Sequence, residues 1–297
     1  MGIIKYKKIF LTFSGILVTA SAVAIITLGF NPGIDFIGGT LWNISLTETH
    51  PSREDVQKFF ADDLGIGGVV ITEQSDGSML LRTPEMNETD HSEYILRLNE
   101  KFGVIEELRF ETIGATIGKE LRTRAIYAVI LVLVAISLYI AFAFKKVSHP
   151  VSSWKYGIIT LVTLFHDALI PAGAFAVAGY MYGLEIDTNF IVALLVVMGF
   201  SVHDTIVVFD RIRENLSIAR NDKRENFDTI VGESISQTIA RSVNTSLTLL
   251  VILVALYLFG APSLTNFILV ILIGTVIGTY SSICLASPLL TVWRRKV

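Results

Sequence analysis

The sequence predicts a polytopic α-helical membrane protein of six transmembrane helices, with one α+β domain inserted after the first helix. Of its 297 residues, 52% are hydrophobic and 17% are charged, and the mean hydropathy of +0.60 exceeds what the core of a soluble domain requires. Six apolar segments are long enough to cross a bilayer. One polar stretch, residues 31–124, interrupts them and is too long to be a plain loop.

The six apolar segments define the membrane part of the chain. They lie at residues 9–30, 125–144, 156–180, 188–209, 242–260 and 266–292. About 20 apolar residues, rising about 1.5 Å each, cross a hydrocarbon core of about 30 Å. The first segment follows basic residues, as a signal peptide does. It is longer than a signal-peptide core and lacks a clear cleavage site, so we expect it to be retained. The predicted divisions are residues 1–30 (N-terminal tail and first helix), 31–124 (the α+β domain) and 125–297 (five membrane helices, with a cytoplasmic segment at 211–241).

The basic residues fall in alternate loops, and this pattern predicts the orientation. They are Lys5, Lys7 and Lys8 before the first helix; Lys145, Lys146 and Lys155 between the second and third; Arg211, Arg213, Arg220, Lys223, Arg224 and Arg241 between the fourth and fifth; and Arg294, Arg295 and Lys296 after the sixth. The opposite loops, MYGLEID and GAPSLT, contain none. By the positive-inside rule, both termini are cytoplasmic and residues 31–124 are extracytoplasmic. We therefore expect a multi-pass protein of the cell membrane.

Residues 31–124 predict the order β-α-β-β-α-β, which is typical of a ferredoxin-like domain. The predicted strands are residues 39–46, 69–74, 78–83 and 104–114, and the predicted helices are 51–65 and 87–103. Ser52 and Asp55 have the spacing of a capping box, and Ser75-Asp76-Gly77 is typical of a hairpin turn.

The same domain contains two histidines, His50 and His91. They are not spaced as metal ligands and neither accompanies a nucleophile, so we interpret both as surface residues. The fold alone carries no activity, and we expect a binding or moving element.

Asp204 is a carboxylate inside the fourth apolar segment, in the stretch SVHDTIVVFDRIRENL. It follows Thr188 by 16 residues, or about 24 Å of helix, so a short side chain does not easily reach water. A charge at such a depth costs about 2.5–3.5 kcal/mol on insertion scales, and no neighbour in its own helix neutralises it. We interpret Asp204 as functional.

The charged residues that follow Asp204 have a simpler interpretation. Asp210, Arg211, Arg213 and Glu214 are consistent with a solvated helix end, with an i,i+3 pair between Asp210 and Arg213. His203 lies about 100° around the helix from Asp204 and receives no role.

The third apolar segment contains a second buried polar group, His166 and Asp167, near its middle. Pro171 cannot donate to the carbonyl of Asp167, which leaves backbone and side-chain polar groups at one level. Two interpretations remain open. The pair is either a structural hydrogen bond between helices or a titrating site.

The fifth segment carries one continuous polar face at i, i+3, i+4 and i+7 spacing. Its members are Ser234, Gln237, Thr238, Arg241, Asn244, Thr245 and Thr248. Arg241 lies at about the depth of Asp204, so the sequence predicts an Asp204–Arg241 pair between the fourth and fifth helices.

In the sixth segment, Gly274, Gly278, Ser282 and Ala286 recur every four residues. This spacing predicts a small-residue face for close helix packing.

Several function classes are disfavoured. The sequence has no GxxxxGK[ST] phosphate loop, no HExxH and no serine in a nucleophile context. We expect no enzymatic activity, no metal site and no cofactor. The net charge of −3 does not indicate a nucleic-acid partner. Buried ionisable residues attached to an outside domain are typical of proton transfer coupled to conformational change.

Three motifs resemble those of the SecF family of protein-export membrane subunits. They are GIDFIGGT at 33–40, FHDALI at 165–170 and SVHDTIVVFDRIRENL at 201–216. QTIARSVNTSLTLL, followed by LYLFG, agrees in position. The resemblance extends over nearly the whole chain. The stretch that contains His203, Asp210 and Arg211 is the most specific of the three.

This resemblance implies half of an RND-type transporter, completed by SecD. It implies use of the proton-motive force for late, ATP-independent steps of preprotein translocation through SecYEG, after the step driven by SecA. It places the family's proton-path aspartate on Asp204 and its helix-five arginine on Arg241, with the FHDALI motif on His166 and Asp167. For Gly33, Asp35, Gly38 and Gly39 we favour a turn out of the membrane.

Two rival functions stay open. One is an RND-type proton-coupled exporter subunit for small molecules or lipids, and the other is a scaffold that stabilises the Sec complex without transport.

Overall fold

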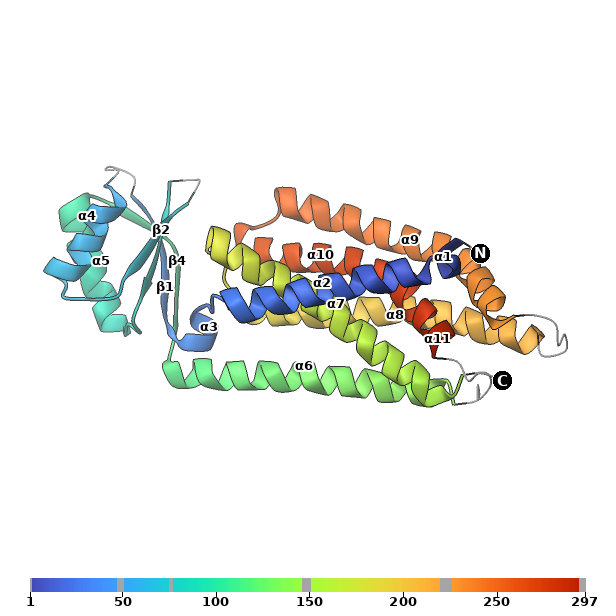
Figure 1. Cartoon of the computed structure of the whole chain (residues 1–297). Helices are drawn as coiled ribbons and strands as arrows, with labels where there is room; N and C mark the ends of the chain where they lie inside the picture. Colours follow the sequence, from blue (N-terminus) through green and yellow to red (C-terminus); the bar gives the residue numbers. More distant parts are fainter. Residues whose placement is uncertain (1, 47–50, 75–76, 146–150, 220–225, 294–297) are drawn as a thin grey trace. The chain divides into compact units, whose positions relative to one another are not determined.

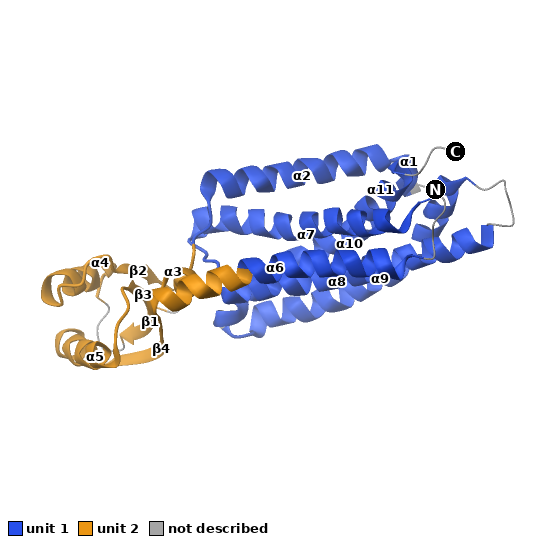
Figure 2. Cartoon of the chain, turned by 90° about the horizontal axis from the view of Figure 1, so that it is seen from below, with its two compact units in different colours: residues 1–31, 126–297 blue, residues 32–125 orange. Residues whose placement is uncertain are grey.

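The computed structural model describes residues 2–46, 51–74, 77–145, 151–219 and 226–293. It divides into two compact units, which are shown in separate colours in Figure 2. Unit 1 comprises Met1–Asn31 and Ile126–Val297, and unit 2 comprises Pro32–Ala125. The division passes through one long helix, α6.

Unit 1 is a bundle of long apolar helices (Figure 1). Six helices of the described chain are long and apolar enough to cross a membrane, and the six predicted spans are confirmed. They are α2 (Lys7–Leu28), α6 (Ala115–Ala143), α7 (Ser153–Tyr182), α8 (Thr188–Ala219), α9 (Phe227–Phe259) and a sixth span over Thr265–Val292. The sixth is composed of α10 (Thr265–Ser281), a π-helical turn η3 (Ser282–Ala286) and α11 (Ser287–Val292). A short α1 (Gly2–Lys5) and a 3₁₀ turn η2 (Pro262–Leu264) complete the unit.

Three helices extend well beyond their predicted apolar spans, by ten residues or more. α6 begins at Ala115, α8 continues to Ala219 and α9 begins at Phe227. Hydropathy detects only the apolar part of a helix, whereas backbone hydrogen bonds continue into the polar residues beyond it. At these ends Asn226 caps α9, since its side chain accepts from the backbone N–H of Asp228.

Small residues allow the bundle helices to approach closely. α8 packs along α10, and α2 packs along α7. A Cβ at Gly274 would lie 2.2 Å from a methyl group of Val197, and a Cβ at Gly278 would lie 3.0 Å from the Cβ of Ser201. The predicted small-residue face of the sixth span is therefore confirmed as a packing surface.

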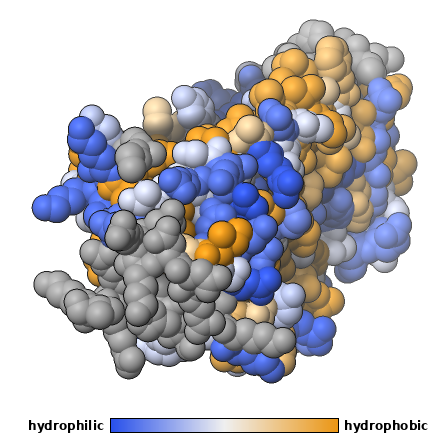
Figure 3. Space-filling model, turned by 90° about the vertical axis from the view of Figure 1, so that its right-hand side faces the viewer, coloured by the Kyte–Doolittle hydropathy of each residue, from blue (hydrophilic) through white to orange (hydrophobic). Residues whose placement is uncertain are grey.

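The short helices α1 and α11 lie at the end of unit 1 where α8 ends and α9 begins (Figure 1). Figure 3 looks onto this end, where hydrophilic residues gather beside hydrophobic ones. Lys7 joins two elements here, because its Nζ lies 2.9 Å from Asp228 Oδ2 of α9 and 3.1 Å from Thr291 Oγ1 of α11.

Unit 2 has the predicted β-α-β-β-α-β order. Its strands are β1 (Gly39–Leu46), β2 (Val70–Glu73), β3 (Met79–Thr83) and β4 (Ile105–Ile113), and its helices are α4 (Arg53–Lys58), the π turn η1 (Phe59–Asp63) and α5 (Glu88–Phe102). The antiparallel sheet has the order β2-β3-β1-β4, the ferredoxin-like arrangement, and the helices cover one of its faces (Figure 1). The Ser52–Asp55 capping box is present, whereas His50, Ser75 and Asp76 lie outside the described residues.

The prediction that His91 is a surface residue is wrong. His91 is only 8% exposed, and its Nε2 lies 2.5 Å from Glu107 Oε2, which also accepts from Trp42 Nε1 at 2.8 Å. The helix period explains the error. His91, Leu98 and Phe102 share the buried face of α5 that packs on the sheet.

The glycine motif after the first span makes a tight turn. A single helical turn, α3 (Ile34–Ile37), follows Gly33, and Gly38 and Gly39 then adopt φ of 80° and 117°. A Cβ at Gly38 would lie 2.7 Å from Ala115 Cα, and one at Gly39 would lie 2.9 Å from the Thr83 carbonyl oxygen. Both positions require glycine for reasons of backbone conformation and space.

Candidate functional site

Asp204 lies on the buried face of α8, with 3% of its surface exposed. Ser201, Thr205 and Val208 share this face, because α8 packs against both α9 and α10. Ser282 of η3 is a donor to this carboxylate, with its Oγ 3.4 Å from Asp204 Oδ2. Ser242 of α9 lies next to the same carboxylate, and its buried hydroxyl has no hydrogen-bond partner among the described residues.

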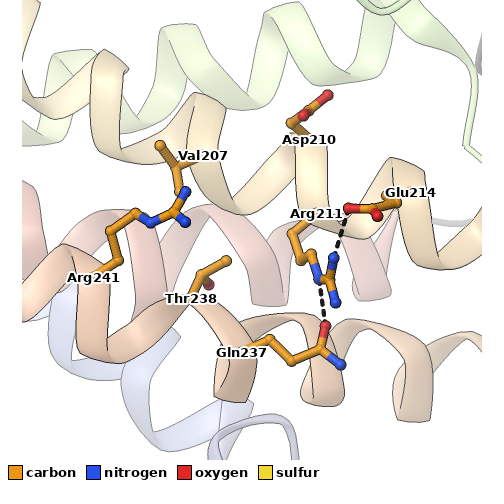
Figure 4. Close-up of a pocket in the computed structure, with 7 residues that line it drawn as sticks. All are labelled: Val207, Asp210, Arg211, Glu214, Gln237, Thr238 and Arg241. Atoms are coloured by element: carbon orange, nitrogen blue, oxygen red, sulfur yellow. Dashed lines mark hydrogen bonds and ion pairs between the residues drawn. The ribbon is translucent and has the colours of Figure 1, made fainter.

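The predicted ion pair between Asp204 and Arg241 is not formed. Within the described ranges, no arginine or lysine lies within ion-pair distance of Asp204, and Arg241 is exposed. Figure 4 shows the Arg241 side chain extending towards Val207 of α8 instead.

The face of α9 explains this correction. The predicted polar stripe spans two faces of the helix, and only one of them is buried. Ser234 and Thr238 point inwards, together with Ser242 and Ser246 at the following four-residue steps. Five members of the stripe are exposed: Gln237, Arg241, Asn244, Thr245 and Thr248. Arg241 immediately precedes Ser242 and is therefore about 100° away from the residue that does face Asp204.

The exposed arginine lines a polar groove of about 380 Å³ between α8 and α9 (Figure 4). Arg211 crosses this groove, since its Nε donates to Gln237 Oε1 at 2.5 Å and its Nη1 lies 2.6 Å from Glu214 Oε2. The predicted i,i+3 pair is present, with Arg213 Nη2 2.7 Å from Asp210 Oδ1. These residues form an exposed helix end. His203 is exposed on α8 as well.

A second buried carboxylate, Asp167 of α7, is fully enclosed. Its Oδ2 accepts from Ser281 Oγ of α10 at 2.7 Å and from Ser201 Oγ of α8 through a short hydrogen bond. Its Oδ1 lies 2.8 Å from His166 Nδ1, and both side chains are buried, at 0% and 2% exposure. Asp167 thus joins three helices at one point.

The second ring nitrogen of His166, Nε2, is buried and forms no hydrogen bond with the described residues. The ring stacks on Tyr280 with a centroid separation of 6.3 Å, and the Tyr280 hydroxyl bonds to Ser14 and to the carbonyl of Phe10 on α2.

Sequence reasoning identified the carboxylates but missed the hydroxyl groups that hold them. Ser201 precedes Asp204 by three residues and so lies on the same helix face. This spacing was available in the sequence and indicates that Ser201 also points into the bundle. Ser281 and Ser282 carried no such signal, because Ser282 belongs equally to the small-residue packing face.

The arrangement has the chemistry of proton binding. Serine hydroxyls contact two carboxylates, and an imidazole bonds to one of these, in an apolar interior where a proton or a cation must neutralise any anion. No cluster of three or more histidine, cysteine or acidic side chains suited to a metal ion is found among the described residues.

Sequence comparison places this site in a known family. Residues 95–296 match the family described as protein export membrane protein SecD/SecF, C-terminal, and residues 23–41 match the SecD/SecF GG motif. Protein translocase subunit SecF of Thermobaculum terrenum is 42% identical over 100% of this chain and 95% of its own length. The corresponding subunit of Anaerolinea thermophila is 34% identical over 99% of this chain and 94% of its own.

Comparison with solved structures agrees. The crystal structure of SecDF, a translocon-associated membrane protein from Thermus thermophilus, matches 99% of this chain with a TM-score of 0.82 and 31% identity. A crystal structure of SecDF in a super-membrane-facing form matches 99% with a TM-score of 0.69. The chain spans only 38% of each SecDF chain. These matches show that the chain, a multi-pass membrane protein, belongs to the SecD/SecF family of protein export membrane proteins, as a SecF-type translocase subunit.

Proposed function

We propose that this chain acts with SecD to use the proton-motive force for late, ATP-independent steps of preprotein translocation through SecYEG, following the action of SecA. The names of its relatives support a role in protein translocation. The likeness to SecDF, of which this chain spans 38%, supports a requirement for SecD.

One observation carries the proposal. Asp204 is buried within an apolar span, and among the described residues it has one long hydrogen bond and no cation. A carboxylate in that environment is retained at an energetic cost, and such groups are typical of proton pathways. We assign the pathway to Asp204, Arg241, His166 and Asp167.

The proposed orientation follows from the basic loops. Both termini and the α8–α9 connection are cytoplasmic, and unit 2 is extracytoplasmic, where it contacts the emerging preprotein. α1, α11 and the end of α8 lie together in unit 1, which supports one common side for them (Figure 1).

The test is gradient-dependent export in membrane vesicles that contain SecYEG, SecD and this chain. We expect Asp204→Asn to abolish the stimulation of export by a proton gradient, because the amide cannot release a proton, while the complex still assembles. Asp210→Asn is the matched control, since this exposed aspartate forms an ion pair at the helix end, and it should retain the stimulation.

Normal coupling in Asp204→Asn would refute the mechanism and favour a scaffold. A photo-crosslinker in unit 2 that captures small molecules or lipids, and never a preprotein in transit, would favour an exporter instead.

A further inference from the structure

The two buried carboxylates meet at adjacent residues of the sixth span, Ser281 and Ser282. Both serines are fully buried. Ser281 ends α10 and faces Asp167 of α7, and Ser282 begins η3 and faces Asp204 of α8. Neighbouring hydroxyls on one backbone therefore contact two different acidic groups.

Each serine hydroxyl lies within hydrogen-bonding reach of two acceptors. Ser281 Oγ lies 2.7 Å from Asp167 Oδ2 and 3.0 Å from the carbonyl oxygen of Gly278. Ser282 Oγ lies 3.4 Å from Asp204 Oδ2 and 3.0 Å from the carbonyl oxygen of Thr279. A serine hydroxyl has one proton to donate, so it favours one acceptor at a time.

The two serines are found in opposite arrangements. Ser281 is closer to its carboxylate, whereas Ser282 is closer to its own helix backbone. Asp167 is consequently well supplied with donors, and Asp204 is left with a weak one. A change in the charge of Asp204 alters which acceptor Ser282 prefers, because a hydrogen bond to an ionised acceptor is stronger than one to a neutral carbonyl.

The backbone at the junction of α10 and η3 is irregular, so it can adjust when Ser282 changes its acceptor. The π-helical segment begins at Ser282, and the carbonyl of Ser282 accepts from Ser287 Oγ at 3.1 Å. Single π turns inside α-helices have irregular hydrogen bonding and recur at functional sites. α8 provides a second connection between the two carboxylates. Ser201 donates to Asp167 and lies three residues before Asp204 on this helix, so a displacement of either carboxylate also displaces α8.

We propose that Ser281 and Ser282 are positioning residues that couple the protonation of Asp204 to that of the His166–Asp167 pair. When Asp204 is ionised, Ser282 donates to it and releases the Thr279 carbonyl. The junction between α10 and η3 then shifts, and the bond from Ser281 to Asp167 changes with it. The inference deepens the proposed function, since it rests on proton binding by Asp204.

Other ionisable groups near the site include His203, which directly precedes Asp204 on α8 and is exposed. Tyr280 of α10 stacks on His166, and Cys284 of η3 lies with Tyr280 on the wall of an apolar groove. α2 contributes the hydroxyl of Ser14 through Tyr280, and α9 contributes Ser242 beside Asp204. Within the described residues, neither carboxylate has an arginine or lysine as an ion-pair partner.

The test is an infrared pH titration of the complex with SecD in lipid nanodiscs, without preprotein or gradient. Asp204→Asn and Asp167→Asn assign the two carboxyl bands. We expect Asp204→Asn to change the proton activity at which Asp167 is half protonated. The expected change is about threefold or more, as for residues whose interactions are coupled. In a Ser281→Ala or Ser282→Ala background this shift should vanish.

Ser246→Ala is the matched control, because Ser246 is a buried span serine whose hydroxyl contacts Thr279 and the Ser242 carbonyl rather than a carboxylate. It should leave the coupling intact. Coupling that persists in the Ser281→Ala, Ser282→Ala double variant overturns the proposal, as does the absence of any shift in the parent protein.

A second pair of variants keeps the proposal testable if the alanine variants do not assemble with SecD. Ser282→Cys preserves volume with a weaker donor and should reduce the coupling, whereas Ser282→Thr keeps a hydroxyl and should restore it. Equal coupling in both overturns the proposal. Because the titration needs no transport, its outcome is separate from that of the export assay with Asp204→Asn.

Discussion

At the scale of single residues, the two buried aspartates differ in how their hydrogen-bonding capacity is met. Asp167 has donors from α8 and α10 and an adjacent imidazole, whereas Asp204 has a long bond from Ser282 at 3.4 Å, with the Ser242 hydroxyl beside it. A satisfied buried acceptor stabilises one arrangement of helices, and an under-supplied one remains available for a proton. The geometry therefore gives Asp167 a structural contribution in addition to its place in the proposed pathway, and it favours Asp204 as the residue that exchanges a proton.

Asp55 in unit 2 provides a prediction about pH at the same scale. Its hydrogen bonds with Ser52 lower the pKa of Asp55 below the ordinary value for aspartate. A folded pKa below the unfolded one means that the stabilisation is present above about pH 4 and is lost as the pH falls through the folded value. We expect hydrogen-exchange protection at the start of α4 to fall in that range.

The comparison for this prediction is between two exposed acidic residues. Asp55→Asn should remove the pH dependence, whereas Glu54→Gln, one residue earlier and outside the capping box, should keep it. Equal pH profiles for Asp55→Asn and the parent chain would contradict the assignment to Asp55.

At the scale of elements, glycines at helix crossings set the spacing on which the carboxylate contacts depend. Gly278 of α10 allows Ser201 of α8 to approach, and Ser201 in turn reaches Asp167 of α7. Gly173 has the same role between α7 and α2, where a Cβ would lie 2.4 Å from Ser21 Cβ and 2.6 Å from Ser21 Cα. Because a backbone atom is among these contacts, a rotamer change alone cannot relieve the clash.

We therefore expect Gly173→Ala to separate α2 from α7 and to destabilise the protein by about 1–3 kcal/mol, as overpacking does. Thermal unfolding in detergent, followed by size-exclusion chromatography, measures the effect. Gly199→Ala on α8 is the control, since no atom lies within 4 Å of its added Cβ, and it should stay within about 1 kcal/mol of the parent chain. Equal losses in both variants would contradict a specific role for the α2–α7 crossing.

At the scale of the whole molecule, unit 1 has a polar surface where lipid would be expected. Arg241, Asn244, Thr245 and Thr248 are exposed on α9, a helix that qualifies as a membrane span. The two threonine hydroxyls donate to carbonyl oxygens of α9 itself, so the side chains of Arg241 and Asn244 are the ones that need outside partners. Exposed polar groups at membrane depth require protein or water as neighbours. Since the chain spans 38% of SecDF, we expect the partner subunit to cover this face.

Site-specific photo-crosslinking in membranes tests this expectation. A crosslinker in place of Thr245 should capture SecD. One in place of Leu131, which is 68% exposed on the apolar surface of α6, should not. Capture of lipid alone from position 245 would show that another arrangement satisfies the polar face.

Much of the fold could be predicted from the sequence because its signals are local. Apolar length defined six spans, alternation and turn residues defined the order of elements in unit 2, and Ser52 and Asp55 marked a cap that is present. Helix ends beyond the apolar spans could not be placed by hydropathy, and the burial of His91 depended on which face of α5 meets the sheet.

For the candidate site, the sequence by itself determined that Asp204 and the His166–Asp167 pair lie inside apolar spans. A charged residue flanked on both sides by a long run of apolar residues is expected to be buried. Only the tertiary structure decided the partners. Ser242 rather than Arg241 faces Asp204, and Ser281 and Ser282 divide between the two carboxylates. Adjacent residues on a helix point about 100° apart, and helix packing alone selects which of them meets its neighbour.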